Sequence, residues 1–221
     1  MSQLVIKITG DISDYEKALE AAASETEALN AKLESSAKTA AVAFALLTAE
    51  AVAAVSAFAA SQAATNKLTA ALQQQGIYSK ELVDDYRNIA SAIQAKTGAD
   101  DDAVVAAMSY AQTLLGQTKI TEDLAFAVSD LAEAKGIDLK GAYELVAKAA
   151  TTNTGILKRY GIEVDDAGDK TANLDRITKE LTAKFGGQAE AAARGLGGIK
   201  LLKNTFGVLQ EEIGKRLAPA F

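Results

Sequence analysis

One stretch decides the fold: residues 37–75 read AKTAAVAFALLTAEAVAAVSAFAASQAATNKLTAALQQQ. No Gly or Pro interrupts these residues, and their commonest residue is alanine, which is the best helix former. The stretch therefore predicts one uninterrupted helix. Gly76 follows directly and supplies the stop, because glycine readily adopts the left-handed conformation that ends many helices.

The surface of this predicted helix is poor in charge. Between Thr39 and Ser61 the only ionisable residue is Glu50. A helix that is apolar all round cannot lie bare in water, so it must pack inside a bundle, against copies of itself or at a membrane. Residues 40–60 are long enough to cross a bilayer, which takes about 20 residues. Because this span is mostly alanine, with a glutamate near its middle, we favour the buried or self-associating helix and keep the membrane as the alternative.

The composition of the 221-residue chain favours an all-α fold. Hydrophobic residues make up 49% of the chain, but aromatic residues only 5%, and there is no Trp. Alanine supplies much of the hydrophobic fraction, and small side chains bury little area each, so we expect a thin core with close contacts between helices. The single proline, Pro219, is typical of long helices.

Charge and residue usage exclude several functions. The chain has 23 Lys and Arg against 29 Asp and Glu, a net charge of −6. Nucleic-acid binding needs clustered cations, so we expect no sequence-specific nucleic-acid partner. There is no Cys, which excludes disulfides and thiolate metal sites, and no His, which removes the usual general base. We therefore name no catalytic residue and expect no enzyme and no cofactor. The first residues also lack the pattern of a secretory signal.

The N-terminal residues predict a short β-strand followed by a coiled-coil-like helix. Residues 4–9 alternate as a strand does and need a partner, either another chain or residues 162–164. Apolar positions then recur in steps of three and four, at Ile12, Tyr15, Leu19, Ala22, Thr26, Leu29 and Leu33. This heptad spacing makes Tyr15, Leu19, Leu29 and Leu33 the candidate self-association residues, although an intramolecular hairpin would show the same spacing. A helix that continued to Gln75 would be about 95 Å long, unless it broke near Ser35.

After Gly76 the sequence changes to short, well-punctuated helices. Each has a capping residue before an amphipathic run, and a glycine usually follows it. The predicted caps are Ser79, Asp100, Thr121 and Asp138, and the glycine stops are Gly98, Gly116 and Gly136. We therefore predict three domains, residues 1–75, 76–161 and 162–221. We also expect residues 76–219 to fold without the N-terminal helix.

The C-terminal domain is predicted as a helical hairpin. Its first helix ends at Gly186 after a one-turn helix near residues 154–161. Its last helix carries an apolar stripe of Ile199, Leu202, Phe206, Leu209, Ile213 and Leu217. The same region holds Gly195, Gly197, Gly198, Gly207 and Gly214. Because glycine weakens a helix, these positions indicate close backbone packing or flexibility.

Three motifs in the last third of the chain carry a family resemblance. They are LKRYGI at residues 157–162, LTAKFGGQAE at 181–190 and LLKNTFGVLQEEIG at 201–214. With the opening IKITGD at residues 6–11 and the alanine-rich helix, they resemble the N-terminal region of phage tail tape measure proteins. The resemblance covers most of the chain.

The resemblance implies a structural protein of the virion, located in the tail interior and, during assembly, in the host cytoplasm. Family members line the tail tube in several copies, and their length sets the length of the tail. The implied partners are other copies of the chain, the tail tube protein and tail assembly chaperones, with transient membrane contact during DNA ejection. Family members are much longer than this chain, whose 221 residues would reach only about 330 Å as one helix. We therefore expect a fragment of a longer protein.

Three patterns resemble ligand sites but have simpler interpretations. Asp169, Thr171 and Asn173 imitate the start of a calcium loop, but the required glycine is replaced by Leu174. The acidic run at residues 100–102 opens a helix, where the helix dipole favours carboxylates without a metal. The glycine-rich residues 195–200 lack the Lys-Ser/Thr of a phosphate loop.

Overall fold

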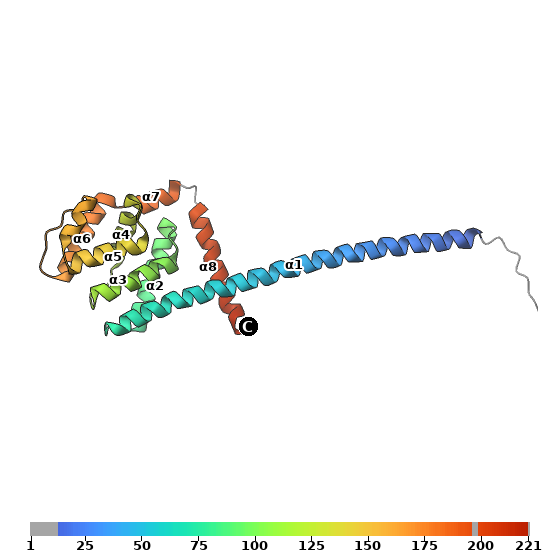
Figure 1. Cartoon of the computed structure of the whole chain (residues 1–221), viewed down its shortest axis with the longest axis horizontal. Coiled ribbons are helices and arrows are strands. Elements are labelled where there is room, and N and C mark those ends of the chain that lie inside the picture. Colours follow the sequence, from blue (N-terminus) through green and yellow to red (C-terminus); the bar gives the residue numbers. More distant parts are fainter. Residues whose placement is uncertain (1–12, 196–198, 221) are drawn as a thin grey trace, which may run out of the picture. The chain divides into compact units, whose positions relative to one another are not determined.

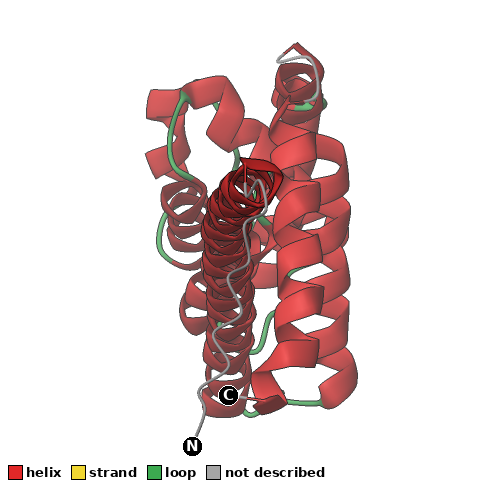
Figure 2. Cartoon of the chain, turned by 90° about the vertical axis from the view of Figure 1, so that its right-hand side faces the viewer, coloured by secondary structure: helices red, strands yellow, loops and turns green. Residues whose placement is uncertain are grey.

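The computed structural model describes residues 13–195 and 199–220, and every regular element in these residues is a helix (Figures 1 and 2). The all-α class is thereby confirmed for the described part of the chain. In chain order the elements are α1 (Ser13–Gln74), α2 (Lys80–Thr97), α3 (Asp101–Leu115), α4 (Glu122–Lys135), α5 (Leu139–Thr151), the 3-10 helix η1 (Thr154–Tyr160), α6 (Lys170–Phe185), α7 (Gln188–Gly195), α8 (Ile199–Leu217) and the 3-10 helix η2 (Ala218–Ala220).

The strand predicted at residues 4–9 lies outside the described residues. Its suggested internal partner, residues 162–164, forms an irregular connection between η1 and α6. The side chains of Ile162 and Val164 are buried in the hydrophobic core. These residues therefore serve core packing and form no strand in the described structure.

Helix α1 runs from Ser13 to Gln74 as one helix of 62 residues, without a break near Ser35. The residue contacts divide the chain into two compact units, Met1–Glu50 and Ala51–Phe221. The described part of the first unit is the N-terminal portion of α1, and the second unit contains the remaining helices. The division therefore lies inside α1 and differs from the boundary that we expected at Gly76.

Local hydrogen bonds define the helix starts and stops in the second unit. The side chains of Ser79, Asp100, Thr121 and Asp138 each accept a hydrogen bond from a backbone N–H in the first turn of the following helix. Gly98 and Gly136 end α2 and α4 in the left-handed conformation, with φ of 65° and 62°. The predicted caps and these stops are confirmed. They depend only on neighbouring residues, which is why the sequence pattern was sufficient.

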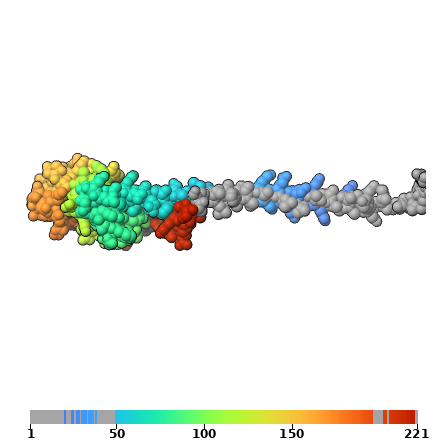
Figure 3. All heavy atoms as spheres, turned by 90° about the horizontal axis from the view of Figure 1, so that it is seen from below, coloured from blue at the N-terminus to red at the C-terminus, as the bar shows by residue number. Residues whose placement is uncertain are grey.

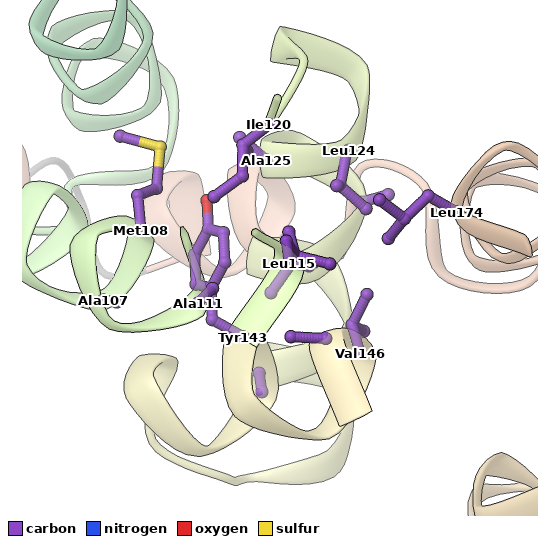
Figure 4. Packing of buried hydrophobic residues seen from close by; sticks show 14 of the residues in the cluster. Ala107, Met108, Ala111, Leu115, Ile120, Leu124, Ala125, Tyr143, Val146 and Leu174 are labelled. Carbon is purple, nitrogen blue, oxygen red and sulfur yellow. The ribbon is translucent and has the colours of Figure 1, made fainter. Parts of the chain in front are cut away.

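The core of the second unit lies around α3, which packs against α2 and α5, while α4 packs against α5, α6 and α7. Figure 4 shows Met108 and Leu115 of α3 beside Tyr143 and Val146 of α5. Many of the remaining contacts are made by alanine, as the composition predicted. Small side chains bring the helix backbones close together but each bury little area.

The last turns of α1 belong to this core. Leu68 and Leu72 are 0% exposed and form part of the same hydrophobic cluster as the helices after Gly76. The boundary expected at Gly76 would separate these leucines from their neighbours. We expected the boundary at Gly76 because the local sequence there predicts the end of a helix. Burial of the leucines depends on tertiary contacts, which the local sequence does not show.

The C-terminal helices do not form the separate hairpin that we expected. Helix α6 packs on α4 and α5, α7 packs on α4 and α2, and α8 packs on α2. The structure also contains α7, which the sequence did not separate from the last helix. The buried carboxylate of Asp130 in α4 accepts hydrogen bonds from the N–H groups of Gly187 (3.0 Å) and Ala189 (2.9 Å). These bonds hold the start of α7 against α4, a tertiary contact that no local pattern indicates.

A buried hydrogen-bond network joins α2, α3 and the loop after α3. The Tyr86 hydroxyl donates to Gln112 Oε1 (2.5 Å) and accepts from the Ile120 N–H (2.8 Å). The Gln112 side-chain amide donates to the carbonyl oxygens of Gly116 (2.6 Å) and Thr118 (3.0 Å). Both side chains are almost completely buried, and the network pairs the buried Ile120 N–H and the partly buried carbonyl groups of Gly116 and Thr118.

We expect the network to make stability fall at alkaline pH. Burial raises the pKa of Tyr86 to about 12, although the hydrogen bond from Ile120 acts in the opposite direction. In the unfolded chain a tyrosine loses its proton near pH 10. Between pH 10 and 12 the unfolded state therefore releases the proton while the folded state keeps it, so the free energy of unfolding falls as the pH rises. Urea unfolding should show that Tyr86→Phe makes the fall of the unfolding free energy with pH shallower, by at most about 1.4 kcal/mol per pH unit. Equal slopes for the two proteins would contradict this assignment, and Tyr78→Phe at an exposed position is the matched control.

Candidate interaction surfaces

The predicted self-association residues all lie in α1. The side chains of Tyr15, Leu19, Leu29 and Leu33 are outside the described residues, so the seam that they would form stays a prediction. The side chains that the structure describes between residues 20 and 38 are exposed, and they lie off the predicted seam. They include Glu20, Glu25, Glu27, Lys32 and Glu34, the charged positions that the heptad pattern placed away from the seam.

A second surface is the apolar face of α8. The stripe predicted there was expected to pack, but Leu202, Phe206, Leu209 and Ile213 are 64%, 63%, 53% and 42% exposed. Helix α8 lies beside α1 (Figures 1 and 3). The face of α8 that contacts the rest of the unit contains Gly214, which lies against the backbone of Ala54 in α1. A Cβ atom at this glycine would collide with the carbonyl oxygen of Ala54. The close backbone packing expected of the C-terminal glycines is thus present at Gly214, and it orients the apolar stripe towards solvent.

An open cavity of about 540 Å³ lies between α8 and the helices that it contacts. Helix α1 contributes Ser61 and Thr65, α2 contributes Arg87, and α3 contributes Asp101. Helix α8 lines the cavity with Val208, Glu211, Glu212 and Lys215. Each of these four helices therefore contributes at least one polar side chain to the cavity, beside the apolar Phe58 and Val208.

Arg87 lies close enough to two carboxylates, Asp102 and Glu211, to act on both electrostatically. The Arg87 guanidinium donates hydrogen bonds to Thr65 Oγ1 (2.5 Å) and Ser61 Oγ (3.2 Å). Its Nη1 atom lies 4.0 Å from Asp102 Oδ1, a buried oxygen that accepts no hydrogen bond. The Asp101 carboxylate accepts a hydrogen bond from the Gln94 amide (2.9 Å). The arginine thus bonds hydroxyl groups, and it leaves the neighbouring carboxylates incompletely neutralised.

This environment favours the protonated form of two of the acids. Burial, followed by the negative charges of Asp102 and Asp101, raises the pKa of Glu211 to about 7. Burial and then Asp101 also raise the pKa of Asp102. The Ser61 hydroxyl and the Arg87 guanidinium lower both pKa values but do not cancel the increase. Sequence reasoning missed this group because its members come from four helices; the pair Ser61 and Thr65, one turn apart in an alanine-rich helix, was the only local signal.

A larger open cavity, of about 760 Å³, is lined by α2, α4, α6 and α7. Several of its polar groups already have partners within the protein. Asp130 holds the start of α7, and Lys179 pairs with Asp175 at 2.8 Å. The Lys96 ammonium lies 4.4 Å from the centre of the Phe126 ring. Because these polar groups already interact within the protein, they stabilise the fold, and we assign this cavity no ligand.

The sequence patterns that imitated ligand sites have structural roles. Asp100 caps α3 and Asp169 caps α6, through hydrogen bonds of 2.9 Å and 3.0 Å. The buried Asn173 amide donates to Asp166 Oδ1 (2.8 Å), and its oxygen accepts from the Ala167 N–H (2.7 Å), which holds the loop before α6. Within residues 13–195 and 199–220 there is no cluster of three or more His, Cys, Asp or Glu side chains that could hold a metal ion.

Comparison with known protein families, curated proteins and solved structures finds no match for the chain. In the part of the chain that the structure describes, each helix is either too short or too polar to cross a lipid bilayer. Two candidate surfaces are the N-terminal portion of α1 and the cavity beneath α8 with the exposed apolar stripe of that helix.

Proposed function

We propose that the chain is a structural protein of a phage tail, the N-terminal region of a tape measure protein. The observation that carries the proposal is α1, one helix of 62 residues whose N-terminal portion forms a compact unit of its own. The resemblance of the three C-terminal motifs to the tape measure family supports it. In this proposal the chain acts as a scaffold in the tail interior and performs no chemistry.

A helical scaffold can measure length because each residue adds a constant rise of about 1.5 Å. The proposed partners are further copies of the chain, the tail tube protein and the assembly chaperones, in the virion and in the host cytoplasm during assembly. Copies of α1 would cover one another's weakly charged surface between Thr39 and Ser61. The ruler role belongs to the complete protein, of which we propose this chain to be a fragment.

The direct test is the length of tails in the virus-producing host. An in-frame deletion of three heptads within residues 13–33, made in the complete gene, should shorten the tails by about 30 Å, as expected from 1.5 Å per residue. Electron microscopy of purified virions measures this length, and mass spectrometry of the same virions detects the chain. Tails of unchanged length, or virions without the chain, would reject the proposal.

Self-association through α1 is the property that can be tested in the purified chain. A lysine in the seam would have to be desolvated without a partner, at a cost of several kcal/mol. We expect Leu29→Lys with Leu33→Lys to lower the oligomeric mass in light scattering and to leave the helicity nearly unchanged. The matched control is Ala28→Lys with Ala31→Lys, which adds the same charge at exposed positions off the seam.

Two results would argue against the seam. One is that the unmodified chain is a monomer at a concentration of about 100 µM. A monomer at that concentration would mean that the free energy of association is weaker than about 5 kcal/mol. Alternatively, the seam variant could lose the helices of the second unit as well.

A membrane-active function remains the second candidate because residues 40–60 are so weakly charged. Strong leakage of liposomes at neutral pH by the purified chain would favour that function over the tail scaffold.

A further inference from the structure

We propose that α8 is a proton-sensitive clasp, which closes on α1, α2 and α3 in acid and loosens as the pH rises to neutrality. The inference depends on the cavity beneath α8 and on the carboxylates that line it. It is independent of the proposed tail function.

The contact that holds α8 is poor in hydrophobic burial. Among the described side chains of α8, Leu202, Phe206, Leu209 and Ile213 face solvent, while Gly214 contacts α1 and Glu211 faces the cavity. Burial of apolar area is the usual source of docking energy, at about 25 cal/mol per Å². Because that term is small here, the charges at the contact have a large influence on whether α8 stays docked.

The charges facing Glu211 are predominantly negative. Helix α1 faces it with the uncharged Ser61 and Thr65, α2 with Arg87, and α3 with Asp101 and Asp102. Asp100, at the N-cap of α3, adds to the negative potential at Asp102. On α8 itself Glu212 and Lys215 line the same cavity, and Glu212 pairs with Arg216 at 3.4 Å. An ionised Glu211 therefore docks against two aspartates whose single nearby arginine donates its hydrogen bonds to hydroxyl groups.

The direction of the pH dependence follows from proton linkage. In the docked state the pKa of Glu211 is about 7, against an ordinary value of 4.5. The docked state therefore binds a proton that the undocked state releases, and docking weakens as the pH rises between these two values. One group of this kind changes the docking equilibrium by at most about tenfold per pH unit. Above about pH 7 both states have lost the proton and the dependence levels off.

The chain contains no Cys, so a single introduced thiol can report the opening of α8. Ala54 is 2% exposed at the contact with Gly214, whereas the neighbouring Ala53 is exposed. The labelling rate of Ala54→Cys divided by that of Ala53→Cys, with a neutral thiol reagent at each pH, removes the intrinsic pH dependence of the thiol. We expect this ratio to rise by about fortyfold from pH 5 to pH 7, as linkage of one proton with pKa values of 4.5 and about 7 predicts.

Glu211→Gln identifies the group responsible. In this background the ratio should stay low and lose most of its change between pH 5 and pH 8, because the amide cannot ionise and Asp102 is the remaining acid at the contact with a raised pKa. Glu212→Gln is the matched control on the same turn, and it should keep the pH dependence of the unmodified chain. Equal flattening by both variants would overturn the assignment to Glu211.

A thiol remote from α8 separates undocking from general unfolding. Ala132 in α4 is buried at 8% exposure, and Ala132→Cys should stay protected over the whole pH range. A ratio at Ala54 that does not change with pH overturns the clasp. A parallel loss of protection at Ala132 also overturns it, because the unit would then be opening as a whole.

Discussion

A piece comprising residues 76–221 is expected to be less stable than a piece comprising residues 51–221 by about 4–10 kcal/mol. The shorter piece lacks Leu68 and Leu72, which are completely buried against the helices after Gly76. Removing the buried atoms of one leucine costs about 2–5 kcal/mol, and the shorter piece also loses the buried Ala64 and Ala71 from the same helix. A domain of this size has a total stability of about 5–15 kcal/mol, so the shorter piece should be largely unfolded or loosely packed.

Urea unfolding followed by circular dichroism measures the difference. The piece 51–221 should unfold cooperatively, and the piece 76–221 should give a broad transition with a much lower midpoint. Single changes in the whole chain provide a matched pair: Leu68→Ala should cost about 2–5 kcal/mol, whereas Asn66→Ala at an exposed position should change stability by less than about 0.5 kcal/mol. Equal midpoints for the two pieces would show instead that Gly76 is a true domain boundary.

Gln112→Leu is expected to destabilise the second unit by about 3 kcal/mol or more. The change keeps a side chain of similar size but removes every hydrogen bond that the buried amide makes. The buried hydroxyl of Tyr86 then loses its acceptor away from water, and the partly buried carbonyl oxygens of Gly116 and Thr118 lose a donor. Each buried polar group left unpaired costs about 1–3 kcal/mol.

A double-mutant cycle tests whether these groups act as a network. Tyr86→Phe alone should cost about 1–3 kcal/mol, because the Ile120 N–H and Gln112 Oε1 lose their partner. The combined variant should cost less than the sum of the two single changes by at least about 0.5 kcal/mol. Gln117→Leu makes the same substitution at an exposed position and should have little effect. Additive costs would mean that Tyr86 and Gln112 stabilise the fold independently.

The sequence predicted correctly those structural features whose physical cause lies in neighbouring residues. A Ser79 or Asp138 side chain reaches the N–H groups of its own first helical turn, and Gly98 ends a helix because of its own backbone freedom. The helical interpretation of residues 37–75 also needed only the local composition, and these residues belong to α1 up to Gln74. The candidate self-association residues were named from heptad spacing, and spacing alone does not identify the partner surface.

The sequence was misleading about α8 and the domain boundary because both depend on contacts between distant residues. The apolar stripe at Leu202 and Phe206 predicted an inward face, but the backbone contact between Gly214 and Ala54 decides the orientation of the helix. Burial of Leu72 likewise depends on helices that follow the glycine stop.

By itself, the sequence determined the all-α class, the helix starts and most helix stops, because propensity, capping and backbone freedom act over one or two turns. Only the tertiary structure decided which helix faces are buried, since burial is a property of pairs of helices. It also brought Arg87, Asp101 and Glu211 to one cavity, although more than 100 residues separate the first from the last. The pKa of Glu211 is raised to about 7 by that assembly, because desolvation and neighbouring charge exist only once the helices have packed.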